Sequence, residues 1–254
     1  MYFDTHAHLS DPAFADDLAA VIGRAKAAGV ERILAPAVDL ATSRRNVELA
    51  AAHPGLLAAV GVHPESVRDL QEGWLEEMED VVELSRPAAM GEIGLDGFHA
   101  DPPVEDQVPI LRAQVRLAAR HNLPLILHSR KAGFDVLRVV DDEGFRGGGV
   151  FHCAEDDEIL ARAILNAGFH LGFGGTLTYP RNDVLRRIVG RLPRERLLIE
   201  TDCPYLAPQP ERGKRNEPAF VIHVAAQMAS ILGISVEEVA GFTTSNAVGL
   251  FRKG

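Results

Sequence analysis

Histidines and carboxylates follow short apolar runs at five places in the chain. His6 and His8 come after the first run, two residues apart. Side chains alternate along an extended segment, so these two imidazoles point the same way, an arrangement that suits zinc or another transition metal but equally fits two surface histidines. The same pattern, one protonatable side chain at the end of an apolar run, is repeated at Glu92, His128, His152 and Asp202.

The two carboxylates strengthen the case for a metal site. A Glu or Asp without a partner is costly inside a protein, and a bound cation removes that cost. We therefore predict that the six side chains meet at one divalent-metal centre and are not unrelated structural polar groups. His63, which ends another apolar run in the sequence GVHP, is either a residue that supports the centre or contacts substrate, or a helix-capping or loop histidine.

The apolar runs predict strands that are buried on both faces of a parallel sheet. Eight such runs lie at 1–3, 32–36, 57–62, 88–92, 125–127, 149–151, 170–172 and 197–199. Helical spacing appears between them, most clearly at 18–25, 104–118, 159–167 and 221–232, and Ser235 with Glu238 predicts a capping box for a late helix. This alternation predicts one α/β domain over residues 1–254, a single (β/α)8 TIM barrel with its site at the carboxyl ends of the strands. An open doubly wound sheet is the alternative.

Composition and charge narrow the class of protein. Of 254 residues, 46% are hydrophobic, and 26 Lys plus Arg against 36 Asp plus Glu give a net charge of −10. This balance argues against a protein that wraps long duplex nucleic acid, although a local basic patch could still hold a nucleic-acid end or a short single strand. Two cysteines form no disulfide framework, no signal peptide is visible, and no apolar stretch approaches the ~18 residues of a membrane span. We expect a cytoplasmic monomer with no membrane partner.

Several motifs, in order along the whole chain, resemble the TatD family of the amidohydrolase superfamily. They are DTHAHL at 4–9, GVHP at 61–64, GEIGLD at 91–96, HSR at 128–130, HC at 152–153, ETDCPYL at 200–206, RGKRNEP at 212–218 and SNA at 245–247. The resemblance implies a TIM-barrel hydrolase with two divalent cations. It also implies divalent-metal-dependent DNA hydrolysis, notably by a 3′–5′ exonuclease-like deoxyribonuclease acting on DNA ends, or, in some members, deacylation of D-aminoacyl-tRNA.

The resemblance also implies how the ligands are shared. His6 and His8 would bind one cation together with Asp202, and Glu92 would bridge both cations. The second cation would be bound by His128 and His152. Two cations about 3.5–4 Å apart can share a water and lower its pKa towards 7, with Asp202 as the general base and Glu92 as the bridging carboxylate. Four imidazoles favour Zn²⁺, Mn²⁺ or a similar ion over Mg²⁺.

Basic and aromatic side chains near the predicted strand ends are candidates for substrate binding. A basic rim on an acidic protein would hold phosphates, and the stretch 207–218 is predicted to be one long functional loop. A solvated loop without a ligand role is the alternative for any single residue, and Tyr205 could stack on a base or pack the loop. The candidates are His63, Arg130, Arg212, Lys214, Arg215 and Tyr205, with Lys131 and Arg181 nearby.

The segment after His152 departs from the family pattern. Family members commonly carry HCFSG, whereas this chain has Glu155 and Asp156 after HCA. These acids would repel a phosphate if they faced the pocket, or would favour the amino end of the next helix if they began it. Cys153 and Cys203 are expected to point away from the metals.

The same metal centre suits two other classes of protein. Because its hydroxide could also attack a carbonyl, an ester or amide hydrolase such as a D-aminoacyl-tRNA deacylase remains the alternative. A non-catalytic metal-binding protein is a third class.

Overall fold

The computed structural model describes residues 1–99 and 101–251. Its strands hydrogen-bond side by side in sequential order, and every pairing is parallel. Their bounds are β1 Tyr2–Asp4, β2 Val30–Ala35, β3 Leu56–Val60, β4 Ala89–Gly94, β5 Leu125–His128, β6 Gly149–Phe151, β7 His170–Phe173 and β8 Leu197–Ile199. The sequential order excludes the open doubly wound sheet, in which the strand order reverses part of the way across.

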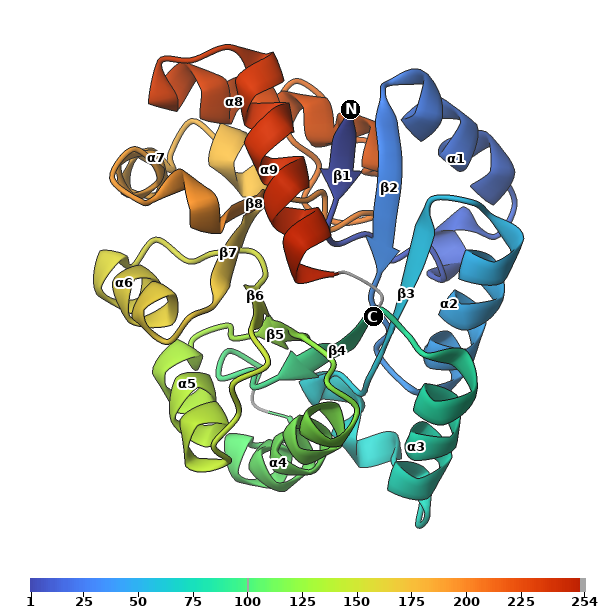
Figure 1. Cartoon of the computed structure of the whole chain (residues 1–254). Helices are drawn as coiled ribbons and strands as arrows, with labels where there is room; N and C mark the ends of the chain where they lie inside the picture. Colours follow the sequence, from blue (N-terminus) through green and yellow to red (C-terminus); the bar gives the residue numbers. More distant parts are fainter. Residues whose placement is uncertain (100, 252–254) are drawn as a thin grey trace.

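The barrel closes through the segments that follow its first and last strands. The Thr5 backbone N–H donates to the Ile199 carbonyl at 3.2 Å, and the Asp202 N–H donates to the His6 carbonyl at 2.8 Å. Figure 1 shows the helices arranged around the strands. The predicted TIM barrel is confirmed, and closure places the residues after β1 beside those after β8.

The helices include the amphipathic segments and the one capping box that the sequence predicts. The four stretches with helical spacing lie in α1, α4, α6 and α8, and the predicted capping box of Ser235 and Glu238 begins α9. The bounds are α1 Leu18–Ala27, α2 Leu40–Ala52, α3 Trp74–Ser85, α4 Val104–Arg120, α5 Gly133–Asp142, α6 Glu158–Asn166, α7 Asp183–Val189, α8 Val221–Leu232 and α9 Val236–Leu250. Within the described ranges, no single helix has the length and hydropathy of a membrane span; the bent pair Pro218–Leu232 and Val236–Leu250 passes that test only together.

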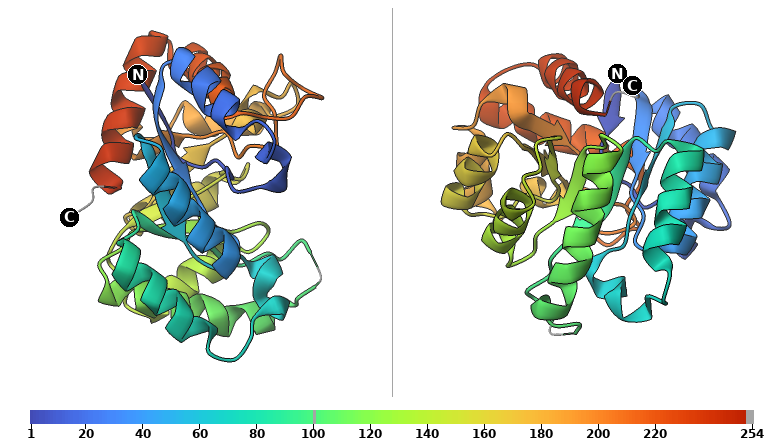
Figure 2. Two further views of the ribbon diagram at one scale, coloured as in Figure 1. Left: turned by 90° about the vertical axis from the view of Figure 1, so that its right-hand side faces the viewer. Right: turned by 60° about the horizontal axis from the view of Figure 1, so that its bottom comes forward.

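Apolar side chains fill the barrel interior and leave only one end for polar groups. Phe3, Leu34, Ile126 and Leu198 belong to one buried cluster, which α9 covers through Phe251. The rings of Phe3 and Phe251 lie 6.1 Å apart. Figure 2 shows that the orange segment before α8 projects on the side of the barrel away from α9. The polar strand ends are therefore confined to the end of the barrel opposite α9.

Candidate metal centre

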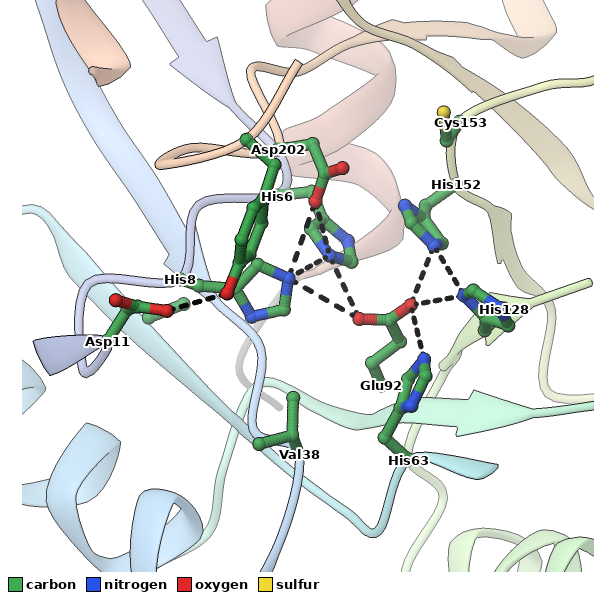
Figure 3. Close-up of polar contacts among 12 residues, drawn as sticks. His6, His8, Asp11, Val38, His63, Glu92, His128, His152, Cys153 and Asp202 are labelled. Atoms are coloured by element: carbon green, nitrogen blue, oxygen red, sulfur yellow. Dashed lines mark hydrogen bonds and ion pairs between the residues drawn. The ribbon is translucent and has the colours of Figure 1, made fainter. Parts of the chain in front are cut away.

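All six predicted ligands meet at the carboxyl ends of the strands, although they come from distant parts of the chain. Figure 3 shows their side chains pointing toward one another, with His63 beside them. Two follow β1, one lies in β4, one ends β5, one follows β6 and one follows β8: His6, His8, Glu92, His128, His152 and Asp202. The structure thus brings together every residue that the sequence assigned to the centre.

One oxygen of the Glu92 carboxylate faces the histidines that follow β1. Glu92 Oε2 lies 3.2 Å from His6 Nε2 and 3.5 Å from His8 Nε2. Asp202 approaches the same two nitrogens, with Oδ1 at 3.7 Å and 3.4 Å. Asp202 adopts a left-handed backbone conformation, with φ of 58°, which is uncommon for a residue other than glycine. Two imidazoles and two carboxylates therefore converge on one point.

The other oxygen of Glu92 faces a second set of imidazoles. Glu92 Oε1 lies 2.8 Å from His128 Nδ1 and 2.7 Å from His152 Nε2. The His152 ring also stacks on His6, with centroids 4.1 Å apart, so it stands between the two sets. Glu92 is only 2% exposed, and its two oxygens divide the centre into two adjoining groups of donors.

Burial and neighbouring charges fix which groups are ionised. Burial lowers the pKa of His6 to about 4, so this imidazole is neutral near pH 7. Burial raises the pKa of Glu92, but the surrounding histidines, His152 most of all, together outweigh burial and hold the pKa well below its usual value. For His152, burial lowers the pKa, but the charge and hydrogen bond of Glu92, together with the charges of Glu200 and Asp202, outweigh burial and raise the pKa to about 10. An ionised, buried carboxylate therefore draws compensating positive charge into the centre.

His63 lies beside the centre and is also the N-cap of the short 3-10 helix Pro64–Asp69. Its Nδ1 accepts the backbone N–H of Glu65 at 3.2 Å, and its Nε2 lies 3.6 Å from Glu92 Oε1. Burial lowers its pKa to about 3, so the ring is neutral. Because Nδ1 accepts a hydrogen bond, the neutral ring carries its proton on Nε2. His63 thus presents a hydrogen-bond donor to the centre.

Asp96 is a buried partner of the centre to which the sequence assigned no role. Its Oδ2 accepts a hydrogen bond from His128 Nε2 at 2.9 Å, on the opposite side of that ring from Glu92. Burial raises the pKa of Asp96, but the hydrogen bonds from His128, His99 and Phe98 together outweigh burial and lower the pKa. The GEIGLD motif contains a usable signal, because residues 92 and 96 are an even number apart in an extended segment.

Two further buried carboxylates, Asp4 and Glu200, hold the backbone around the centre. Asp4 accepts hydrogen bonds from the Thr201 N–H at 2.9 Å and the Thr201 hydroxyl at 2.6 Å, which ties the end of β1 to the segment after β8. Glu200 accepts the Cys153 N–H at 2.5 Å and lies under Gly172, where any Cβ would collide with its carboxylate. Burial raises the pKa of Glu200 to about 7. Because Gly172 in β7 has no side chain, the Glu200 carboxylate fits beside it and positions the segment after β6.

A cavity of about 660 Å³ opens over the centre. Among the candidate substrate residues, His63, Arg130 and Tyr205 line it. The Tyr205 hydroxyl donates to Asp11 Oδ2 at 2.8 Å, and its ring lies edge-on to His8 with centroids 6.1 Å apart. Tyr205 thus forms one wall of the cavity and is held from outside it.

The basic residues of the RGKRNEP loop lie away from the cavity and contact other residues of the described part of the chain. Arg212 stacks on the Tyr179 ring at 4.4 Å, and Lys214 pairs with Glu211 at 2.6 Å. None of the three loop cations is among the residues that line the cavity. Arg215 binds carboxylates, with its guanidinium nitrogens 2.8 Å from both oxygens of Asp17 and 3.1 Å from Glu217 Oε1.

The acids after His152 do not line this cavity either. Glu155 accepts the Lys131 backbone N–H at 3.2 Å, and α6 begins only at Glu158, after its N-cap Asp157.

Cys203 is fully buried, and Figure 3 shows the sulfur of Cys153 pointing away from the cluster. Cys153 therefore has the expected orientation.

Comparison with known proteins gives full-length matches. The model of the TatD related DNase family matches residues 3–252. An uncharacterized metal-dependent hydrolase of Bacillus subtilis is 41% identical over 253 residues, covering 99% of both chains. A Pantoea vagans protein named 3′-5′ ssDNA/RNA exonuclease TatD is 34% identical over 257 residues, covering 98% of this chain and 99% of the relative.

Solved structures agree in fold. The crystal structure of YjjV, a TatD homolog from Escherichia coli, superposes with a TM-score of 0.93 at 34% identity and covers 98% of this chain and 97% of its own. An organophosphorus hydrolase from Deinococcus radiodurans gives a TM-score of 0.65 at 17% identity, covering 98% of this chain and 92% of its own, and shares the fold alone.

Proposed function

Because the chain belongs to the TatD family of metal-dependent hydrolases, we propose that it is a divalent-metal-dependent phosphodiesterase that removes nucleotides from the 3′ ends of DNA. The observation that carries the proposal is the Glu92 carboxylate, whose two oxygens face two separate groups of imidazoles. The relative named as a 3′-5′ exonuclease supports the choice of a nucleic-acid substrate.

The donor set fits two divalent cations. The His6 and His8 Nε2 atoms face each other at 3.1 Å, and His128 Nδ1 faces His152 Nε2 at 3.3 Å. Pairs of imidazole nitrogens turned toward one another suit a shared cation better than a shared proton, because a bound cation accepts both lone pairs. Compensating charge for the buried Glu92 would come from the same cations.

We assign the ligands to two cations according to the Glu92 oxygen that they face. His6, His8 and Asp202 would hold one cation, His128 and His152 the other, and Glu92 would contact both. A set rich in imidazole favours Zn²⁺ or Mn²⁺ over Mg²⁺. When bound, the cations would lower the pKa of water and neutralise charge on the phosphoryl oxygens.

The chain's own residues supply proton transfer and orientation. Burial raises the pKa of Asp202, but its hydrogen bond with His8 and the other neighbouring histidines together outweigh burial and lower the pKa, so Asp202 is ionised at pH 7 and able to accept a proton. It takes the proton from the attacking water as the water oxygen bonds to phosphorus and the bond to the 3′ oxygen breaks; the 3′ oxygen then takes up a proton from solvent to become the product hydroxyl. The Nε2–H of His63 donates to a phosphate oxygen, and Tyr205 offers a ring face to the terminal base.

We further propose that one domain, residues 1–254, acts as a cytoplasmic monomer on DNA ends or short single strands. The net charge of −10 supports this choice over long duplexes, because a chain with that charge repels an extended phosphate backbone. Size-exclusion chromatography with light scattering tests the monomer directly, and a mass of two chains would contradict it.

The decisive experiment follows single-stranded DNA labelled at its 5′ end. Purified protein loaded with Zn²⁺ or Mn²⁺ is expected to shorten the strand one nucleotide at a time, whereas Asp202→Asn, with an unchanged melting temperature, should not. Absence of cleavage by folded, metal-loaded protein would contradict the proposal. Turnover of D-aminoacyl-tRNA without DNA cleavage would replace it with an ester hydrolase.

A further inference from the structure

Phe98 is an exposed aromatic residue in the segment between β4 and α4, and core packing does not explain it. It is 56% exposed, and the guanidinium carbon of Arg130 lies 3.8 Å from its ring centroid. Arg130 follows β5 and lines the cavity over the metal centre. The exposed ring is therefore one half of a stacked pair at the mouth of this cavity.

Hydrogen bonds hold the two segments together and fix the position of the ring. The Gly97 N–H donates to the Arg130 carbonyl at 2.8 Å. The N–H groups of Phe98 and His99 both donate to Asp96 Oδ1 at 2.8 Å. Asp96 is buried and also binds His128, so the segment that carries Phe98 is anchored to the centre itself. The backbone that carries the Phe98 ring is thus held beside Arg130.

The positive charge of Arg130 is also available to a ligand. In residues 1–99 and 101–251, no carboxylate pairs with it, whereas Lys214 and Arg215 are paired with acids of this chain. On a protein with a net charge of −10, a guanidinium that lines the active-site cavity without an acidic partner is available to an anionic ligand.

We propose that Phe98 is a positioning residue, which holds the Arg130 guanidinium flat so that its edge binds a phosphate of the substrate. The inference rests on the proposed function, because it assumes a nucleotide in the cavity. A guanidinium stacked on a ring keeps its N–H donors free at its edge, where they match two phosphate oxygens. Stacking also removes rotamers that would otherwise be lost on binding.

The experiment compares the binding of a deoxynucleoside 5′-monophosphate and of the matching nucleoside to metal-loaded protein by calorimetry. Phe98→Leu keeps an apolar side chain but removes the ring face. It is expected to raise the Kd of the nucleotide roughly two- to fivefold and to leave the nucleoside unaffected. Phe98→Trp should retain wild-type affinity. Phe134→Leu, a matched control at a ring that is 52% exposed and does not line this cavity, should have no effect.

A double variant decides whether Phe98 acts through the arginine. Arg130→Ala should weaken nucleotide binding roughly tenfold, and adding Phe98→Leu should weaken it no further. An effect of Phe98→Leu that persists without Arg130, or that weakens nucleoside and nucleotide equally, would overturn the inference. If the wild-type protein binds nucleotide through Phe98 and Arg130 but cleaves no DNA, the proposed function is wrong and the inference about Phe98 stands.

Discussion

Replacing Arg215 tests whether the RGKRNEP loop contributes substrate contacts or structure. The sequence places this arginine among the substrate-binding candidates, but its guanidinium faces Asp17 and Glu217 and donates to the Ala13 carbonyl at 2.6 Å. It also lies 4.7 Å from the centroid of the Phe14 ring. We therefore predict that Arg215→Ala lowers the stability of the fold and leaves the KM for DNA close to that of the wild type.

The magnitude follows from the exposure of the partners. The side chains of Arg215 and Glu217 are 32% and 11% exposed, whereas Asp17 is more exposed and its pair is screened by solvent, so we count nothing for it. Buried hydrogen bonds to charged groups contribute about 1.5–3 kcal/mol, and partial exposure reduces this to roughly 1.5 kcal/mol in total. In a protein of this size such a loss corresponds to a fall in Tm of about 3–6 °C.

The assay is thermal unfolding at pH 7, in low and high salt, alongside steady-state kinetics on DNA. Lys214→Ala is the control in the same loop, since Lys214 is exposed and pairs only with Glu211 among the described residues. It should change the Tm by less than about 2 °C. Arg215→Lys should restore only part of the stability, because an ammonium cannot bind a carboxylate in bidentate geometry. An unchanged Tm together with a raised KM would refute the reasoning.

Four other outcomes are expected. Asp96→Asn should weaken metal binding about ten- to hundredfold by titration, without unfolding, because His128 loses its charged partner; unchanged affinity would contradict this. Gly172→Ala should reduce the yield of folded protein on expression, since its Cβ would meet the buried Glu200 carboxylate; wild-type yield and Tm would show that β7 can shift. Burial raises the pKa of Glu217, but its arginine partners outweigh burial and lower the pKa below 4.5. The ionised Glu217 therefore stabilises the fold above pH 4.5, and this contribution is lost as the pH falls through the folded-state pKa. The Tm difference between wild type and Glu217→Gln should shrink in acid. Chelation should abolish hydrolysis and lower the Tm, and re-addition of Zn²⁺ or Mn²⁺ should restore both.

The convergence of the six candidate ligands could be predicted because a parallel barrel brings all its strand ends to one rim. His6 and Asp202 are far apart in sequence, yet each directly follows a strand, and the strands pair in sequential order. Any polar residue at such a position therefore meets the others, however the helices pack outside. The cap of α9 was predictable for a related reason, because Ser235 and Glu238 interact within one helical turn.

The surroundings of the centre were less predictable. Asp96 carries no sequence signal beyond its spacing from Glu92, and its role depends on which nitrogen of His128 faces which carboxylate. Ring orientation is set by packing and hydrogen bonds from several elements at once. The sequence therefore indicates which residues approach the centre, but not the atoms through which they meet.

The sequence alone determined the barrel and the identity of the residues at its polar end, because strand periodicity and strand-end position are local properties of the chain. Only the tertiary structure decided which cations remain free for a ligand. Arg130 and Arg215 look alike in sequence, but one stacks on Phe98 at the cavity and the other binds Asp17, 198 residues away. Whether a charged side chain is paired or free to bind a ligand depends on the groups within about 4 Å of it, and long-range packing sets those neighbours.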